Sequence, residues 1–151
     1  MVKVHYRHTQ YGALMFAVLL LVAILVAVVA VEIISQGRST AAVTMIFVYL
    51  LGVVMFYSST VEVSGRQVRF WFGIGLVRRN IPLDTIQAVR EVVNPWYYFW
   101  GIKSIPGGWL YAIAPGPAVE IKLMDGKVIH LGSNQTRELK EAIGAAMQTG
   151  G

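Results

Sequence analysis

Residues 13–31 read ALMFAVLLLVAILVAVVAV, an unbroken run of apolar side chains without a single charge. A helix of this length rises about 28 Å, close to the roughly 30 Å of a bilayer's hydrocarbon core. Residues 41–57, AAVTMIFVYLLGVVMFY, form a second run at the lower length limit for a span. Lipid offers no hydrogen-bond partners to the backbone, so both runs are expected to be helical. They predict a two-helix transmembrane hairpin, with spans at about 13–34 and 41–57.

The composition separates this apolar segment from the rest of the chain. Of the 151 residues, 56% are hydrophobic and 14% are charged, and no Asp, Glu, Lys or Arg occurs at positions 8–31 or 39–61. Soluble domains usually carry roughly 25% charged residues. The two charge-free segments exclude a plain cytosolic globule, a disordered chain and a nucleic-acid-binding tail. The absence of Cys excludes a disulfide framework and a thiol nucleophile.

Two other interpretations of the apolar runs are open. A cleaved signal peptide has an apolar core of about 7–15 residues, which is shorter than the first run, and no second apolar run directly behind it. A helical hairpin buried in a soluble core would need a large polar shell, for which 94 residues remain after Tyr57. The linker SQGRST at residues 35–40 has room only for a tight turn, so it favours two antiparallel helices.

Basic residues near the ends of membrane spans mark the cytoplasmic side. Two precede the first run and four lie at positions 66–79 after the second, whereas the connecting loop has only Arg38. This asymmetry predicts a multi-pass membrane protein with both termini in the cytoplasm. We therefore divide the chain into residues 1–57, an N-terminal tail with the transmembrane hairpin, and residues 58–151, a cytoplasmic domain.

After residue 58 the hydrophobic pattern changes from helical to alternating. Apolar side chains then recur at every second position, which is typical of strands with one buried face. An Asp-Gly pair at 125–126 supplies the positive φ angles of a tight hairpin turn. The expected strands lie at residues 61–64, 67–72, 76–81, 86–93, 119–123 and 128–131.

The last segment has the pattern of an amphipathic helix. Ser133 or Asn134 can cap its N-terminus. Apolar residues then recur every three or four positions, and they are Leu139, Ala142, Ile143, Ala146 and Met147. Short strands followed by one such helix predict an α+β domain, in which the helix covers the open end of a β-sandwich or a partly closed barrel.

Three stretches of this domain carry a resemblance to a known family. They read VRFWFGIGLVRRNIPLDTIQAVR at 68–90, AVEIKLMDGKVIHLGSN at 118–134 and RELKEAI at 137–143, with a Gly-Ile-Lys step at 101–103 between them. Together they resemble the bacterial pleckstrin-homology-like (PH-like) domains that follow short transmembrane hairpins. The resemblance implies a seven-stranded, strongly bent antiparallel sheet capped by the C-terminal helix, and it implies a location in the bacterial inner (plasma) membrane. Its motifs are structural, and none is a catalytic signature.

No set of residues predicts catalysis, and we expect neither an enzyme nor a bound cofactor or metal. His5 and His8 would share a face if the tail were helical, but two ligands without a nearby carboxylate or Cys make a poor metal site. Gly73 and Gly75 lack the third glycine and the following helix of a dinucleotide fingerprint. His130 lies in a predicted strand, between two apolar residues, and is expected to face solvent.

The aromatic run at 96–100 is the most unusual feature of the sequence. Alternate side chains of an extended segment point to opposite faces, so five consecutive rings cannot all be buried. Exposed rings would contact the lipid–water interface or a protein partner, and an irregular loop folded back on the sheet is the third possibility. With nearby basic residues, the candidate partner or lipid contacts are Trp96, Tyr97, Tyr98, Phe99, Trp100, Arg78, Arg79 and Lys103.

These observations predict a membrane-anchored binding or scaffold module that presents a cytoplasmic β domain to a partner protein or to lipid head groups. The alternative is an accessory subunit of a larger membrane complex, such as a transporter or envelope machinery. Small residues at Ala41, Ala42 and Gly52 would then allow close packing of another helix. The expected partners are the bilayer and a protein or a second copy of the chain, and neither nucleic acid nor a small-molecule substrate is expected.

Overall fold

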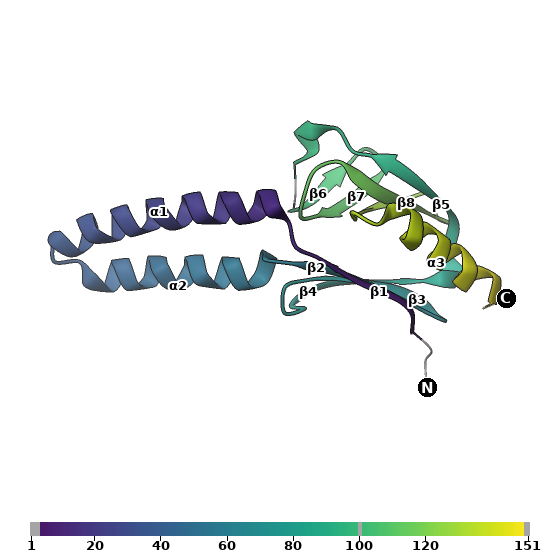
Figure 1. The fold of residues 1–151 in the computed structure, drawn as a ribbon, viewed down its shortest axis with the longest axis horizontal. Coiled ribbons are helices and arrows are strands. Elements are labelled where there is room, and N and C mark those ends of the chain that lie inside the picture. Colours follow the sequence, from purple (N-terminus) through teal and green to yellow (C-terminus); the bar gives the residue numbers. More distant parts are fainter. Residues whose placement is uncertain (1–3, 100, 150–151) are drawn as a thin grey trace.

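The computed structural model describes residues 4–99 and 101–149, which form a helical hairpin and a β domain (Figure 1). Helix α1 spans Ala13–Ser35 and helix α2 spans Ser39–Phe56. Both apolar runs are therefore helical, as predicted, and a short turn makes the helices antiparallel. Lys3, one of the basic residues used to predict orientation, and Trp100 lie outside the described residues.

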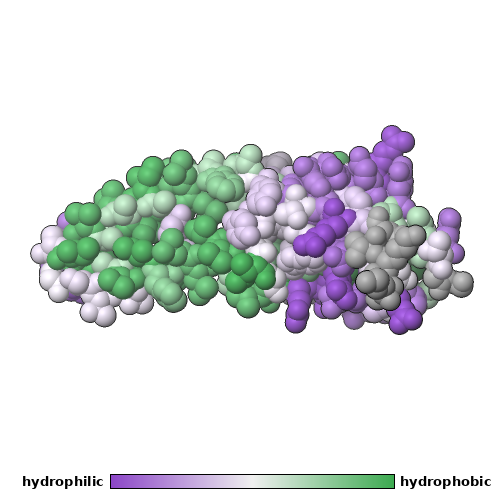
Figure 2. All heavy atoms as spheres, turned by 60° about the horizontal axis from the view of Figure 1, so that its bottom comes forward, coloured by the Kyte–Doolittle hydropathy of each residue, from purple (hydrophilic) through white to green (hydrophobic). Residues whose placement is uncertain are grey.

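The hairpin exposes nearly all of its apolar surface. In the most apolar window of each helix, 11% of the residues in α1 and 6% in α2 are buried. Figure 2 shows this surface as a continuous hydrophobic body that ends at the mostly hydrophilic β domain. Both helices are long and apolar enough to cross a membrane. Such exposure does not fit a hairpin buried in a soluble core. It fits a hairpin whose apolar side chains are surrounded by lipid.

One polar contact ties the two helices together. The hydroxyl of Tyr49 in α2 donates a hydrogen bond to the backbone oxygen of Leu19 in α1, at 2.8 Å. A hydroxyl placed among apolar side chains needs such a partner, because an unpaired polar group in an apolar medium is costly. The bond fixes the rotation of one helix relative to the other.

In the part of the chain that the structure describes, nine strands form two sheets. The first has the antiparallel order β1-β2-β3-β4, with strands β1 Val4–Gln10, β2 Ser59–Ser64, β3 Gln67–Phe72 and β4 Val77–Pro82. The second has the order β5-β8-β9-β7-β6, with strands β5 Ile86–Val93, β6 Gly101–Ile105, β7 Gly108–Ala112, β8 Pro117–Leu123 and β9 Val128–Gly132. Short 3₁₀ turns, η1 (Leu83–Thr85) and η2 (Trp96–Tyr98), precede and follow β5.

The core lies between the two sheets and helix α3, which spans Thr136–Thr149. Leu139, Ile143 and Ala146 of α3 are buried, so the predicted apolar stripe is confirmed. They pack against large residues of both sheets, including Phe70 and Leu131. Burying each such aliphatic or aromatic side chain contributes roughly 1.5–3 kcal/mol, so packing rather than local propensity holds α3 in place.

The α+β class, the Asp-Gly hairpin and the C-terminal helix are confirmed, but the sheets differ from the pattern that the resemblance implies. Residues 4–99 and 101–149 contain nine strands rather than seven, and β7 pairs with β9 in parallel. The parallel pair arises because the chain reverses twice, into β8 and then into β9. One of the additional strands, β1, comes from the N-terminal segment, which was predicted only as a tail.

Strand β1 forms because one edge of β2 is open to it. VHYRHTQ pairs antiparallel with β2 from Val4 to Gln10, with one irregularity near its start. Tyr6 packs against the core, and its hydroxyl donates to the Gln135 side chain at 3.1 Å. Pairing of an exposed edge satisfies its backbone hydrogen bonds. The first sheet therefore includes a strand from outside residues 58–151.

The hairpin and the β domain are joined without a flexible linker. Two residues separate β1 from α1, and two separate α2 from β2. Gln10 pairs with Ser59, so the two helices continue directly into neighbouring antiparallel strands. Because both connections are this short, the orientation of the β domain follows that of the hairpin. Strand β1 and helix α3 both lie at the same end of the hairpin (Figure 1).

Two glycines let both sheets approach the base of the hairpin. A Cβ atom at Gly12 would stand 3.0 Å from the carbonyl oxygen of Ile113, in the loop after β7. A Cβ atom at Gly73, whose φ is +48°, would collide with the carbonyl oxygen of Val54 in the last turns of α2. The N–H of Gly73 also donates to the carbonyl oxygen of Ser58 at 2.8 Å. These contacts fix the turn between β3 and β4 against the helix.

Candidate functional site

The topology brings the aromatic run to the end of the β domain that carries the hairpin. Strand β4 ends at Pro82, far from α2, and η1 turns the chain into β5. Strand β5 runs back toward the helices and ends at Val93 (Figure 1). The aromatic loop, which we define as residues 95–99, therefore leaves the sheet near the hairpin. Gly101, just beyond it, lies beside both helices in an apolar groove.

The aromatic loop is a tight turn rather than an extended segment, so the expected alternation of its rings does not apply. Trp96, Tyr97 and Phe99 are 74%, 56% and 48% exposed, and they contact one another edge to face. Tyr98 alone turns inward, against a small apolar cluster of the second sheet. The loop thus rests on one anchoring ring and presents the other three. Trp100 lies outside the described residues.

Lys103 is the one predicted basic residue that joins the aromatic loop. Its ammonium group lies 5.5 Å from the centre of the Phe99 ring, within cation–π distance. Arg78 and Arg79 lie on β4 of the other sheet, where both are exposed. The candidate residues therefore form two groups on different sheets. This division depends on the order of the strands, which residue spacing along the chain does not indicate.

A polar cluster holds the start of the aromatic loop. Glu120 accepts hydrogen bonds from Arg90 at 2.6 and 3.0 Å. His130 lies between Glu120, at 3.0 Å, and the side-chain oxygen of Asn94, at 2.6 Å. Hydrogen bonds from Arg90 lower the pKa of Glu120, with a further contribution from His130. The cluster connects β5, β8 and β9 to Asn94, the residue from which the aromatic loop begins.

The prediction that His130 faces solvent is wrong. Its side chain is 12% exposed and makes the two contacts just described. His130 does lie on the outer face of its sheet, as the alternation indicates, but the segment after Asn94 folds over that face. Strand periodicity shows which face a residue occupies and cannot show what covers that face.

Sequence reasoning missed a second set of exposed residues at the base of the hairpin. Ile74 and Leu76, in the turn between β3 and β4, are 61% and 65% exposed beside the end of α2. Tyr11 and Tyr57 lie at the two junctions, with ring centres 6.2 Å apart. The sequence signal for this set was the presence of two apolar residues, Ile74 and Leu76, in a turn that contains two glycines. We call these four residues, with the aromatic loop, the rim.

The described residues offer little for chemistry. Among them, no group of three or more His, Cys, Asp or Glu side chains could hold a metal ion. The idea that His5 and His8 share a helical face is wrong, because residues 4–10 form a strand, in which positions three apart face opposite ways. His8 instead lies 2.7 Å from the Asn134 side-chain oxygen, and the side chain of His5 is outside the described part.

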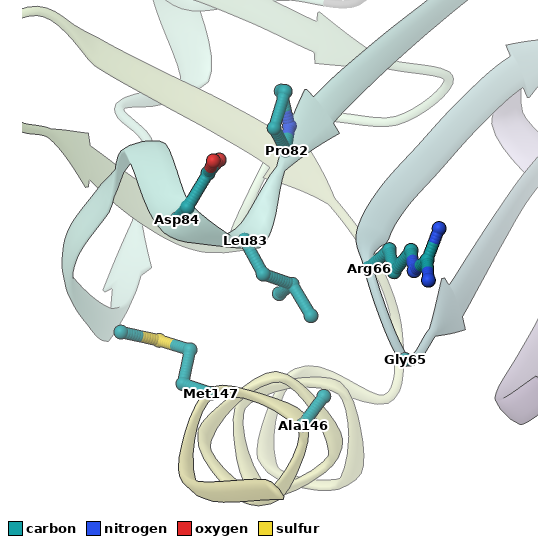
Figure 3. Close-up of a pocket in the computed structure, with 7 residues that line it drawn as sticks. All are labelled: Gly65, Arg66, Pro82, Leu83, Asp84, Ala146 and Met147. Atoms are coloured by element: carbon teal, nitrogen blue, oxygen red, sulfur yellow. The ribbon is translucent and has the colours of Figure 1, made fainter. Parts of the chain in front are cut away.

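A pocket at the far end of the domain, between η1, the turn after β2 and α3, is largely apolar (Figure 3). Leu83 points toward α3, while the charged ends of Arg66 and Asp84 lie on opposite sides of the pocket (Figure 3). This arrangement brings no acid, base or nucleophile together. The pocket therefore adds no candidate catalytic set to the rim.

Comparison with models of protein families finds no match for this chain, and no curated protein matches its sequence. The rim and the polar cluster are therefore interpreted from their geometry.

Proposed function

We propose that this protein is a membrane-anchored binding module of the PH-like type, whose hairpin crosses a bilayer and whose β domain rests on the lipid surface through the rim. The observation that carries the proposal is the position of the aromatic loop, at the end of the domain where the apolar hairpin begins (Figure 1), together with the exposure of its rings Trp96, Tyr97 and Phe99. Trp and Tyr concentrate at the lipid–water interface, because their rings are apolar and their N–H or O–H groups are polar.

The rim has the composition of an interfacial belt. The head-group layer of each leaflet is about 5–7 Å thick. Tyr11 and Tyr57 stand within two residues of the helix ends, and Ile74 and Leu76 lie beside α2. Lys103 adds a cation next to Phe99. Aromatic and apolar side chains thus surround the base of the hairpin at the depth where such side chains prefer to lie.

The short junctions between the hairpin and the β domain would hold the domain in one orientation relative to the membrane. A domain on a flexible tether would sample many orientations, whereas α1 and α2 continue directly into β1 and β2. With the rim on lipid, the exposed face of α3, which carries Arg137, Glu138, Lys140 and Glu141, remains available to a partner protein. The distribution of Lys and Arg supports a position of the domain on the cytoplasmic side. The resemblance to bacterial PH-like domains supports a bacterial inner membrane. Two sheets covered by a C-terminal helix support the PH-like assignment. The nine strands of the described residues differ from the seven that this assignment implies.

A depth measurement on the full chain tests the proposal. The protein contains no Cys, so Tyr97→Cys can be labelled alone with bimane and reconstituted in phosphatidylcholine nanodiscs. A nitroxide on the lipid head group should quench this label strongly. Met124→Cys is the matched control, since Met124 is exposed on the turn after β8, at the end of the domain away from the hairpin. Its label should be quenched weakly.

Two results would count against the proposal. Equally weak quenching at both positions would show that the aromatic loop does not reach lipid. If Trp96→Ala and Tyr97→Ala instead remove crosslinks to another protein in native membranes, the aromatic loop binds protein, and the accessory-subunit alternative gains.

A further inference from the structure

We infer that the outer face of the β1–β4 sheet, next to α2, binds the head group of an anionic phospholipid. The inference rests on the proposed function, since it needs a bilayer at the level of the rim. It concerns a groove that the aromatic loop does not touch. The groove is lined by Arg69, Trp71, Ile74, Gly75, Arg78 and Asn80.

The strand register gathers these side chains on one face. Trp71 pairs with Arg78 across β3 and β4, and Arg69 pairs with Asn80 two residues further along. Cross-strand partners project from the same face of a sheet. Phe70 alternates with these residues and is buried in the core, so the groove faces outward. Two guanidinium groups thus lie at diagonal positions on either side of one indole ring.

The charges around the groove are unbalanced. Arg7 of β1 adds a third guanidinium, which lies 5.6 Å from the centre of the Trp71 ring. Glu62 is the facing carboxylate, and it reaches only Arg69, at 3.8 Å. Among the described residues, no ion pair involves Arg7 or Arg78. Guanidinium groups bind phosphate oxygens through paired hydrogen bonds, so three arginines facing one glutamate favour an anionic group.

The position of the groove selects a lipid as the source of that anion. Gly73 lies against Val54 and Met55 in the last turns of α2, and Trp71 stands two residues before it in the chain. At about 3.3 Å per strand residue, the Trp71–Arg78 pair stands about 7 Å from this contact with α2, a distance close to the thickness of the head-group layer. Gly75 packs on the indole, and the neighbouring Ile74 is exposed. An apolar tip beside arginines matches a molecule with an acyl chain and a phosphate.

The net positive charge favours an anionic lipid over a zwitterionic one. A choline head group would place its own cation near three guanidinium groups. Phosphatidylglycerol carries no such cation, and anionic lipids give the cytoplasmic leaflet its negative surface potential. The site is therefore expected to retain phosphatidylglycerol in preference to phosphatidylcholine.

Native mass spectrometry of the full chain, released from detergent micelles that contain one of the two lipids, tests this inference. The wild type should retain phosphatidylglycerol at concentrations where phosphatidylcholine is lost. Arg69→Gln/Arg78→Gln should weaken phosphatidylglycerol retention at least about tenfold, because each charge-assisted hydrogen bond contributes more than a neutral one. The matched control is Arg66→Gln/Arg137→Gln, which removes the same charge from exposed positions outside the groove and should retain the lipid like the wild type.

Equal lipid retention by the two double variants would overturn the inference. Complete displacement of the lipid by millimolar inorganic phosphate would also overturn it, by reducing the site to one for a free anion. Thermal unfolding of both variants establishes that they fold alike. The nanodisc experiment uses only neutral lipid, so it tests the depth of the aromatic loop independently of any preference for anionic lipid. Equal retention of the two lipids would therefore contradict this inference without contradicting the proposed function, whereas weak quenching in the nanodiscs would contradict the proposed function.

Discussion

Glu120 is the residue on which the polar cluster beneath the aromatic loop depends. It is nearly buried and bonds to both Arg90 and His130, so it connects three strands to the start of the loop. A buried carboxylate is tolerated only when its oxygens are paired, and both oxygens here are paired. The cluster is a structural support for the loop, and its geometry offers no catalytic arrangement.

Glu120→Gln should therefore destabilise the β domain by about 1–2 kcal/mol at neutral pH, because charge-assisted hydrogen bonds to Arg90 and His130 are weakened. The pKa of Glu120 is lowered from its ordinary value of 4.5. A lowered folded pKa means that the carboxylate stabilises the fold above about pH 4.5, and that this stability is lost as the pH falls through the folded value. Denaturant unfolding in detergent at pH 7 and near pH 3 should show the gap between variant and wild type closing in acid.

The control for this prediction is Glu141→Gln, which removes an exposed carboxylate that pairs with Arg137 on the same helix. An exposed pair four residues apart adds little stability. A loss as large as that of Glu120→Gln, or a gap that stays constant with pH, would contradict the role given to the cluster.

At the scale of elements, the turn between β3 and β4 shows how a glycine couples the β domain to the hairpin. Gly73 has a positive φ and touches the carbonyl groups of the last turns of α2. Gly126, in the turn after β8, also has a positive φ, but open space surrounds it. Substitutions at these two positions therefore separate the free-energy cost of a left-handed backbone from the free-energy cost of a clash with α2.

Gly126→Ala should cost about 1 kcal/mol, which is the penalty for a left-handed alanine. Gly73→Ala should cost at least about 2 kcal/mol more, because its Cβ atom must displace backbone atoms of α2. Thermal unfolding of the full chain in detergent measures both. Similar losses for the two variants would show that the turn does not press on the helix.

Elements with strong local patterns were predictable from the sequence. The two apolar helices, the Asp-Gly hairpin and α3 all follow from periodicity, which needs no knowledge of the neighbours. Strand β1 was not predictable in this way, because its seven residues are mixed in polarity and form a strand only beside β2. The aromatic loop was identified as unusual, but its tight turn depends on Tyr98 reaching a cluster built from distant residues.

At the scale of the whole molecule, the order of the strands decides what the candidate site contains. Lys103 joins the aromatic loop, whereas Arg78 lies in the groove of the other sheet. This separation is a property of two sheets that share one core, and the spacing of residues along the chain does not carry it. Both groups nevertheless lie near the hairpin, because each sheet has an end at its base.

The central claim is that the hairpin crosses a bilayer and holds the β domain on one side of it. Single cysteines test the claim directly, because the chain has none of its own. In bacterial spheroplasts, a membrane-impermeant maleimide should label Gln36→Cys, in the turn between the helices, before lysis. It should label Met124→Cys, in the β domain, only after lysis. Labelling of both positions from the same side would contradict the account.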